Sequence, residues 1–156
     1  MRLFLIAALL LAAGCSIKPQ SYRYVSLERC HEAPKRDLGL YEIELPDYFI
    51  DERLPYKEGE RLGYLEQKVA REPREFLSRC AAKALGACLY PWDCEKKPAK
   101  ILRVRIDEFY FDRAKGEVVI VAAAGGQRYR VAQPVEDDPV AAALRAYRRL
   151  LAQIGR

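Results

Sequence analysis

The chain has 156 residues, of which 51% are hydrophobic and 31% charged, and its formal net charge is +5. A chain of this length is long enough for one domain with a hydrophobic core. The basic excess is small and is interspersed with acidic residues, so the composition does not indicate a nucleic-acid partner. The single histidine, His31, lies in a charged stretch, and no glycine-rich phosphate loop is present. Without a nucleophile beside a base or a nucleotide motif, we expect a non-enzyme that needs no cofactor.

The N-terminus has the pattern of an export signal. Arg2 precedes an unbroken apolar run over residues 3–12, and small residues follow the run. A positive start, a short apolar run and small residues before a cleavage point define a secretory signal, and this run is too short to span a bilayer as a helix. We therefore predict a signal peptide over residues 1–14, which exports the rest of the chain.

The end of this signal resembles a bacterial lipobox. The sequence Leu11-Ala-Ala-Gly-Cys15 ends in the cysteine, which in lipoboxes becomes the new N-terminus and carries fatty-acyl chains such as palmitate. This predicts lipidation of Cys15, a tether over residues 15–21 and stable anchoring. Ser16, rather than an aspartate, follows the cysteine, which under the usual sorting rule favours the outer membrane, with the domain facing the periplasm. An ordinary signal peptide cleaved near Ala13 is the alternative.

Four further cysteines predict disulfide bonds in an exported chain. They are Cys30, Cys80, Cys88 and Cys94. We expect Cys80 and Cys88 to lie on one helix, about 12 Å apart along its axis, which exceeds the Cα separation of about 7 Å that a bridge tolerates. Two pairings stay open, and we favour Cys88–Cys94 with Cys30–Cys80, because residues 88 and 94 are close along the chain. A metal site with His31 is disfavoured, because the ligand spacing is unlike that of zinc sites.

Alternating apolar and polar residues predict strands along much of the chain. The clearest alternation lies over residues 40–45, where Tyr41, Ile43 and Leu45 face inward. Further strands are predicted over residues 22–27, 54–57, 61–66, 101–106, 109–111, 117–124 and 127–135. Turns at Glu58-Gly59, residues 112–116 and Gly125-Gly126 join them as hairpins. A change of phase after residue 106 indicates a bulge, and residues 117–124 are apolar on both faces, as a central strand would be.

Two helices are predicted. The first opens at Pro73 and ends near Gly86, and its apolar stripe comprises Phe76, Leu77, Cys80, Ala81, Ala84, Leu85 and Cys88. The second begins at Pro139 after a cap at Asp137 or Asp138. Its apolar residues recur at heptad spacing and are Val140, Leu144, Tyr147, Leu151 and Ile154. This seam predicts packing on the domain's own sheet, with self-association as the alternative.

These elements predict an α+β fold in a single domain over residues 22–156. Consecutive strands joined by tight turns make a mostly antiparallel sheet of about five to seven strands, with two main helices on one face, a two-layer sandwich. The segment over residues 45–53 is unexplained by this scheme, because it places Tyr48 and Phe49 after a Pro-Asp turn. The two aromatic side chains either plug the edge of the sheet or form an exposed contact for a partner.

Several motifs in order along the chain resemble the auxiliary lipoproteins of ABC-type transporters, the family that includes paraquat-inducible protein C. After the lipobox, residues 22–27 resemble the family's tyrosine-bearing first strand. Residues 45–53 resemble its Leu-Pro-x-Tyr-Leu motif, and residues 102–109 resemble its strand that ends in a phenylalanine. A strand over residues 116–120 and an alanine-rich C-terminal helix complete the resemblance, which covers nearly the whole chain.

The resemblance implies a role rather than a reaction. Such lipoproteins work with an inner-membrane ABC permease and its ATPase, and with an MCE-domain protein that spans the periplasm. Together they move lipids or other hydrophobic molecules between the two membranes. The resemblance also implies a small antiparallel sheet with helices and, as in several members, a homo-oligomeric ring. A structural or assembly lipoprotein of the outer membrane with no transporter partner is the alternative function.

Overall fold

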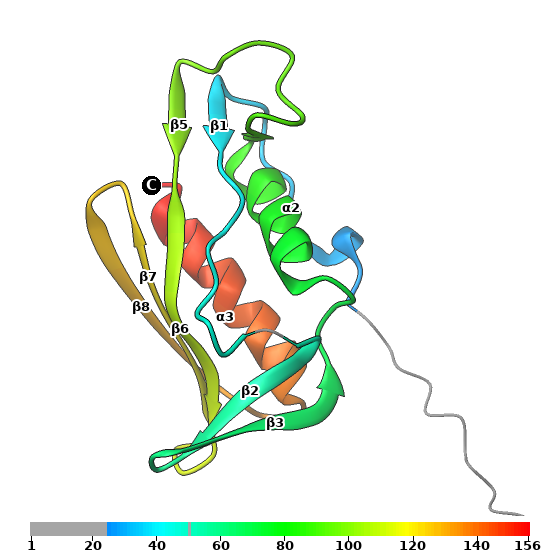
Figure 1. The fold of residues 1–156 in the computed structure, drawn as a ribbon, viewed down its shortest axis with the longest axis vertical. Helices are drawn as coiled ribbons and strands as arrows, with labels where there is room; N and C mark the ends of the chain where they lie inside the picture. Colours follow the sequence, from blue (N-terminus) through cyan, green and yellow to red (C-terminus); the bar gives the residue numbers. More distant parts are fainter. Residues whose placement is uncertain (1–24, 50) are drawn as a thin grey trace, which may run out of the picture.

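The computed structural model describes residues 25–49 and 51–156 (Figure 1). The described chain forms an α+β domain, as the sequence predicts, with two α-helices and two β-sheets. Its elements in order are η1 (Leu27–Arg29), β1 (Leu38–Leu40), β2 (Arg53–Glu58), β3 (Arg61–Lys68), α2 (Pro73–Leu85), β4 (Cys88–Leu89), β5 (Lys100–Leu102), β6 (Val104–Asp112), β7 (Glu117–Ala124), β8 (Gln127–Pro134) and α3 (Pro139–Ile154). The predicted signal peptide, Cys15 and tether lie outside the described residues. Neither described α-helix has the length and hydropathy needed to cross a membrane.

The larger sheet has the strand order β3-β2-β6-β7-β8. The hairpins β2–β3, β6–β7 and β7–β8 are antiparallel, as predicted. The predicted bulge in β6 is a register shift between Ile106 and Glu108. Strand β7 is buried on both faces from Val118 to Ala122, which confirms it as a central strand. Strands β2 and β6, in contrast, run parallel and pair only near their ends.

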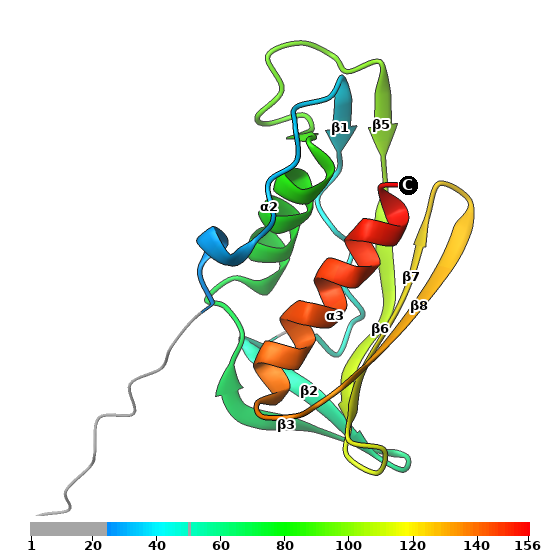
Figure 2. The ribbon, with the colours of Figure 1, turned by 180° about the vertical axis from the view of Figure 1, so that it is seen from behind.

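Helix α3 covers one face of this sheet, packing on β7 and β8 (Figure 2). Asp138 caps the helix, since its carboxylate accepts the Val140 N–H at 3.0 Å, and Pro139 occupies the first turn. The predicted seam therefore packs inside the domain: Tyr147 is fully buried, and its hydroxyl donates to the Leu77 carbonyl of α2 at 2.8 Å. Burial raises the pKa of Tyr147 far above its ordinary value. This bond ties α3 to α2 through the core.

The second sheet has the order β4-β1-β5, and both of its pairings are parallel. The strand predicted over residues 40–45 is wrong for most of its length, because β1 ends at Leu40 and Glu44 makes only an isolated bridge to Arg105. The segment still runs beside β5 and β6, and the Glu44 N–H donates to the Val104 carbonyl at 3.1 Å. The Ile43 N–H instead donates to the Ser78 hydroxyl of α2 at 2.8 Å, which interrupts the ladder of backbone hydrogen bonds between strands. The Ile43 side chain is fully buried.

Helix α2 begins at Pro73, as predicted, and ends at Leu85 because Gly86 adopts φ of +64°. A Cβ at Gly86 would collide with the Pro34 carbonyl oxygen. Cys88 therefore lies in β4, and its predicted position on the helix is wrong. The favoured pairing nevertheless holds, because the structure contains the Cys30–Cys80 and Cys88–Cys94 disulfides.

The start of the described chain differs from its prediction. Residues 22–24 of the predicted first strand lie outside the described residues, and Leu27 begins the short helix η1 instead of ending a strand. Val25 makes one backbone bond, donating its N–H to the Val69 carbonyl at 3.1 Å. The disulfide from Cys30 to Cys80 then fixes this stretch against α2, which η1 contacts.

Candidate interaction site

The segment between Leu45 and Arg53 interrupts the parallel run of the chain beside β6. The Phe49 N–H donates to the Pro46 carbonyl at 2.8 Å, which closes the predicted Pro-Asp turn. At the far end, the Asp51 carboxylate accepts a hydrogen bond from Arg53 at 2.8 Å and a second from the Glu52 N–H. The Arg53 guanidinium accordingly lowers the pKa of Asp51. These contacts fix the loop as a defined element.

Tyr48 provides a hydrogen-bond acceptor for a backbone N–H of β6 that has no strand partner on the β2 side of the sheet. Its hydroxyl accepts the Phe109 N–H at 2.9 Å, next to the bulge in β6, and pairing of β2 with β6 starts only at Phe111. The Tyr48 carbonyl in turn accepts the Tyr64 hydroxyl at 2.6 Å. Burial raises the pKa of Tyr48 from 10.0 to about 12, so the phenol holds its proton at a higher pH than an exposed tyrosine does. Tyr48 thus replaces a missing strand contact.

Phe49 is a core residue. Its side chain is 5% exposed, and its ring centroid lies 5.2 Å from that of Phe109, which lies 6.4 Å from the ring of Tyr147. The three rings join the loop, β6 and α3. Of the two alternatives for Tyr48 and Phe49, the structure matches the edge plug. As an exposed partner contact Phe49 is wrong, because its ring is buried, and Tyr48 is half-buried with its hydroxyl occupied.

The same segment forms one wall of a groove with a volume of about 660 Å³. The opposite walls are the first turns of α2 and the loop after β4. Its apolar surface comes from Leu45, Pro46, Phe49, Leu89 and Trp92. Trp92 is 81% exposed, far more than Leu62, which at 40% is the other large hydrophobic side chain exposed in the described ranges.

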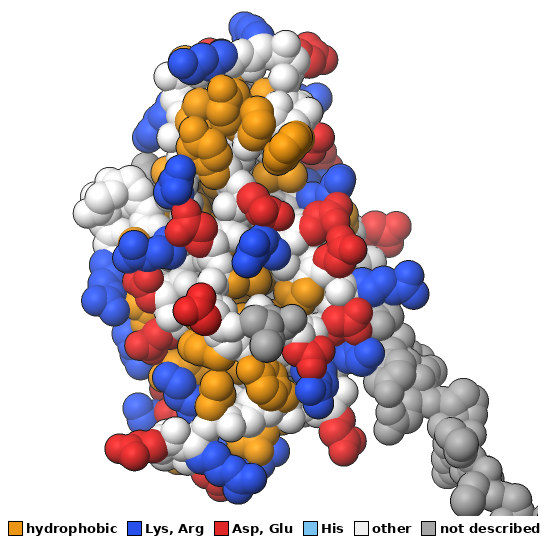
Figure 3. Space-filling view, viewed as in Figure 1, with side chains coloured by type: hydrophobic (Ala, Val, Ile, Leu, Met, Phe, Trp, Pro, Cys, Tyr) orange, Lys and Arg blue, Asp and Glu red, His pale blue; other side chains and the backbone are white. Residues whose placement is uncertain are grey.

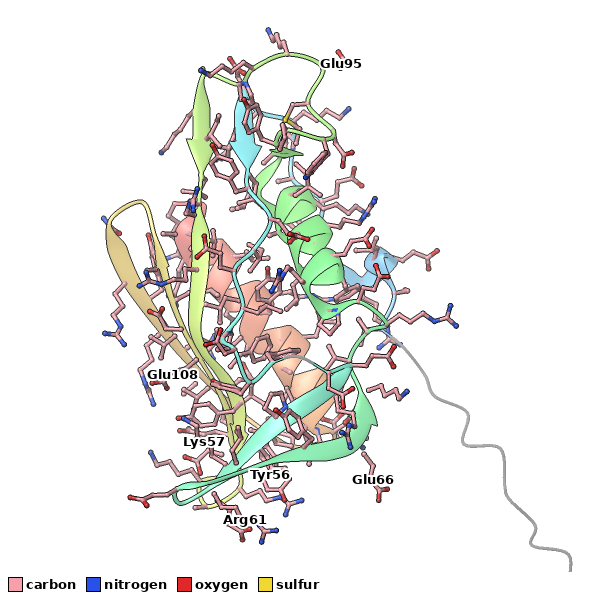
Figure 4. All side chains as sticks on the ribbon, in the orientation of Figure 1. Tyr56, Lys57, Arg61, Glu66, Glu95 and Glu108 are labelled. Carbon is pink, nitrogen blue, oxygen red and sulfur yellow. A yellow bond between two sulfur atoms is a disulfide. The ribbon has the colours of Figure 1, made fainter. Side chains whose placement is uncertain are left out.

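The loop that carries Trp92 is held at both ends. The Cys88–Cys94 disulfide closes it, with Cα atoms 5.3 Å apart. Within it, the Asp93 N–H donates to the Leu89 carbonyl at 2.7 Å, and the Tyr90 N–H donates to the Leu40 carbonyl of β1 at 2.8 Å. The tip of the molecule beyond this loop carries Glu95, labelled in Figure 4. The exposed indole is therefore presented by a restrained backbone.

The groove carries an excess of negative charge. Five carboxylates line it, from Glu42, Asp47, Glu72, Glu75 and Asp93, against the two guanidinium groups of Arg74 and Arg79. The Glu75 carboxylate pairs with Arg79 at 2.8 Å. A hydrogen bond with Glu75 and the charge of that carboxylate raise the pKa of Glu72, as expected where like charges crowd. Figure 3 shows one face of the molecule, viewed as in Figure 1. Hydrophobic side chains gather at the upper end of this face, above a belt of mixed charge.

The opposite end of the domain has a different character. Lys57 of β2 lies 4.2 Å from the Tyr110 ring and 5.9 Å from the Tyr48 ring, and Arg113 lies 3.8 Å from the Tyr56 ring. Figure 4 labels Tyr56 and Lys57 on β2 at this end, far from Glu95. Cations placed in this way cover aromatic rings, and Tyr56 and Tyr110 are both half-buried, in contrast to the exposed Trp92.

Sequence reasoning singled out Tyr48 and Phe49 but missed Trp92. The signal for it was present, because the sole tryptophan of the chain falls between two cysteines that are close in sequence. The structure places His31 on the surface. Within residues 25–49 and 51–156, the structure contains no group of three or more histidine, cysteine, aspartate or glutamate side chains that could hold a metal ion.

Comparison with known proteins identifies the fold alone. No family model matches the chain, and no curated protein matches it. The chain is similar to the crystal structure of an uncharacterized protein, with a TM-score of 0.64 and 17% identity over 85% of this chain and 95% of the other. It is also similar to a Xanthomonas campestris protein of family DUF330, with a TM-score of 0.57 and 14% identity over 85% of this chain and 89% of the other. Both solved structures thus share nearly the whole domain.

Proposed function

We propose that the protein is a lipid-anchored, non-catalytic auxiliary subunit of an ABC/MCE-type transport system that moves lipids or hydrophobic molecules between membranes. In this proposal the lipid on Cys15 holds it at the outer membrane. The domain faces the periplasm, where it docks on an MCE-domain protein that works with the ABC permease and ATPase. A homo-oligomeric ring is the form of assembly that the family resemblance adds.

The segment over residues 45–53 is the observation that carries this proposal. Its Leu-Pro-x-Tyr sequence resembles the family motif, and in the structure it is a specialised element rather than a generic loop. Tyr48 completes the edge of β6 through its hydroxyl, while Leu45 and Pro46 form a wall of the groove. A motif that both stabilises the sheet and shapes a surface groove suits a subunit whose work is binding a partner.

Crosslinking in cells tests the proposal. Affinity purification of the tagged, full-length lipoprotein from crosslinked cells should recover an MCE-domain protein together with the permease and ATPase. The Cys15→Ser variant should disappear from the outer-membrane fraction and lose this recovery, because the anchor is gone. Recovery of outer-membrane assembly factors alone would instead favour the assembly lipoprotein and overturn the transport proposal. Separation of the purified protein by size tests the ring.

A further inference from the structure

The exposed side chain of Trp92 is a candidate contact for a ligand. A large aromatic side chain that is 81% exposed leaves most of its apolar surface in water, and burying such surface is worth roughly 25 cal/mol per Å². Tryptophan is also the residue most enriched at the energetic centres of protein interfaces. Here it stands beside a groove of about 660 Å³ that has apolar side chains along its length.

The surroundings of Trp92 lower the cost of binding. The Cys88–Cys94 bridge and two backbone hydrogen bonds hold the loop before any ligand arrives. A side chain on a backbone that is already held requires less ordering on binding than one on a free loop. The opposite wall is equally fixed, because the Pro46 turn and the Asp51–Arg53 pair hold it. The groove is a preformed site.

The charges of the groove select among the possible occupants. Its five carboxylates outnumber its two guanidinium groups, and they repel the phosphates of lipid headgroups, which bind to basic surfaces instead. A second copy related by a two-fold axis would bring the same acidic rim against itself, and in a ring the rim would have to meet a different face of the next copy. Lysine or arginine side chains would pair with the rim while neighbouring apolar side chains cover Trp92. A polypeptide segment supplies both kinds of group together.

We infer that the groove beside Trp92 is the docking site for a segment of a partner protein in which apolar side chains are flanked by lysine or arginine. The inference rests on the proposed function, since it names the surface through which the auxiliary subunit holds its partner. It assigns a binding role to Leu45 and Pro46, which line the groove beside the mostly buried ring of Phe49.

Trp92 is its own reporter, because it is the only tryptophan in the chain. Full-length lipidated protein in phosphatidylcholine vesicles would be titrated with three short peptides without tryptophan. The peptides share a central Leu-Leu-Phe and differ in flanking lysine, serine or glutamate. The lysine-flanked peptide should shift the tryptophan emission to shorter wavelength and saturate, with an affinity about tenfold or more above that of the glutamate-flanked peptide. No shift, or equal affinity for all three peptides, would overturn the inference.

Substitutions then identify which side chains contribute to peptide affinity. Fluorescence anisotropy of the labelled lysine-flanked peptide should show an affinity loss of about tenfold or more in Trp92→Ala. The matched control is Leu62→Ala, which removes a large hydrophobic side chain that is 40% exposed and lies outside the groove, and it should change affinity by less than about twofold. The pair Glu42→Gln and Asp47→Asn should reduce the preference for lysine over glutamate flanks. Equal losses in Trp92→Ala and Leu62→Ala would count against this groove.

A photocrosslinking residue in place of Arg74 or of Leu62 separates this inference from the proposed function. Capture through position 74 of an apolar, lysine- or arginine-flanked segment of an MCE-domain protein supports both. Such a segment from a different protein supports the groove and overturns the transport role. Capture of an MCE-domain protein through position 62 alone supports transport and overturns the groove. Crosslinks from position 74 to lipid or to a second copy also overturn the groove.

Discussion

The meander β6–β8 with α3 and the irregular run from β1 to β2 bury apolar surface in different ways. In the meander, neighbours in sequence are neighbours in space, tight turns set the register, and β7 is buried on both faces. The run from β1 to β2 lies beside β5 and β6 although some sixty residues separate the paired positions, as in Leu38 with Lys100. There the ladder breaks, and single side chains replace it.

This difference in strand pairing explains where the groove lies. The Ser78 hydroxyl accepts a hydrogen bond from the Ile43 N–H, and the Tyr48 hydroxyl accepts one from the Phe109 N–H. These backbone donors therefore have hydrogen-bond partners without a continuous strand. The chain between these two points supplies Leu45, Pro46 and Asp47 to a wall of the groove. Both disulfides also lie on this side of the molecule and are absent from the meander. The groove thus lies on the side of the molecule where the strand pairing is irregular and where both disulfides are found.

The largest effect is expected from the disulfide that ties the start of the described chain to α2. Replacing Cys30 and Cys80 together by alanine should lower the free energy of unfolding by about 4 kcal/mol, because the bridge closes a loop with a sequence separation of 50. The same change at Cys88 and Cys94, with a separation of 6, should cost about 2 kcal/mol. Urea unfolding measures both. A larger loss from the shorter loop would contradict this ranking.

Phe49 tests whether the plug belongs to the core. Phe49→Ala should lower the free energy of unfolding by about 3 kcal/mol, since it removes a buried ring that packs on Phe109. Trp92→Ala is the control on the opposite wall of the groove, and because its side chain is exposed it should change stability by less than about 0.5 kcal/mol. Thermal unfolding with partner capture distinguishes them. Normal stability with lost capture in Phe49→Ala would return this residue to the surface.

The same contrast explains what the sequence could predict. Turns at Gly59, Gly116 and Gly125-Gly126, and period-two alternation, are local signals, so the hairpins, the bulge in β6 and the central strand were predicted correctly. The cap at Asp138 is equally local. The parallel pairing of β2 with β6, and the sheet β4-β1-β5, depend on contacts between distant segments. Alternation over residues 40–45 predicts the burial of Ile43. It cannot predict that the Ser78 hydroxyl accepts the hydrogen bond from the Ile43 N–H.

The candidate site follows the same rule. Chain proximity predicts the Cys88–Cys94 pairing correctly, although Cys88 lies in β4 and not on the predicted helix. The sequence pattern predicts no role for Trp92, because its place at the groove depends on where β4, α2 and the segment after β1 meet. Composition can mark a tryptophan between cysteines, but only the packing of three distant segments places it at a groove.

The smallest effect concerns the hydroxyl of Tyr48. Tyr48→Phe keeps the ring but leaves the Phe109 N–H without its acceptor, which should cost about 1 kcal/mol near neutral pH. Tyr64→Phe is the matched control, since it removes the bond to the Tyr48 carbonyl instead. Urea unfolding should rank Tyr48→Phe as the more destabilising change, because the Phe109 N–H is a donor at a strand edge. Equal stability of Tyr48→Phe and the unmodified protein would remove the strand-edge role.

The pH dependence gives the same hydroxyl a separate signature. Burial raises the pKa of Tyr48 from 10.0 to about 12, so above pH 10 the unfolded chain releases this proton while the folded chain still holds it. Stability that is present below pH 10 is therefore lost as pH rises towards 12. The loss should be shallower in Tyr48→Phe, with a residual slope from Tyr110 and Tyr147, whose pKa values burial also raises. Identical slopes in the variant and the unmodified protein would show that Tyr48 ionises as freely folded as unfolded, and its hydroxyl would then lie in water rather than against β6.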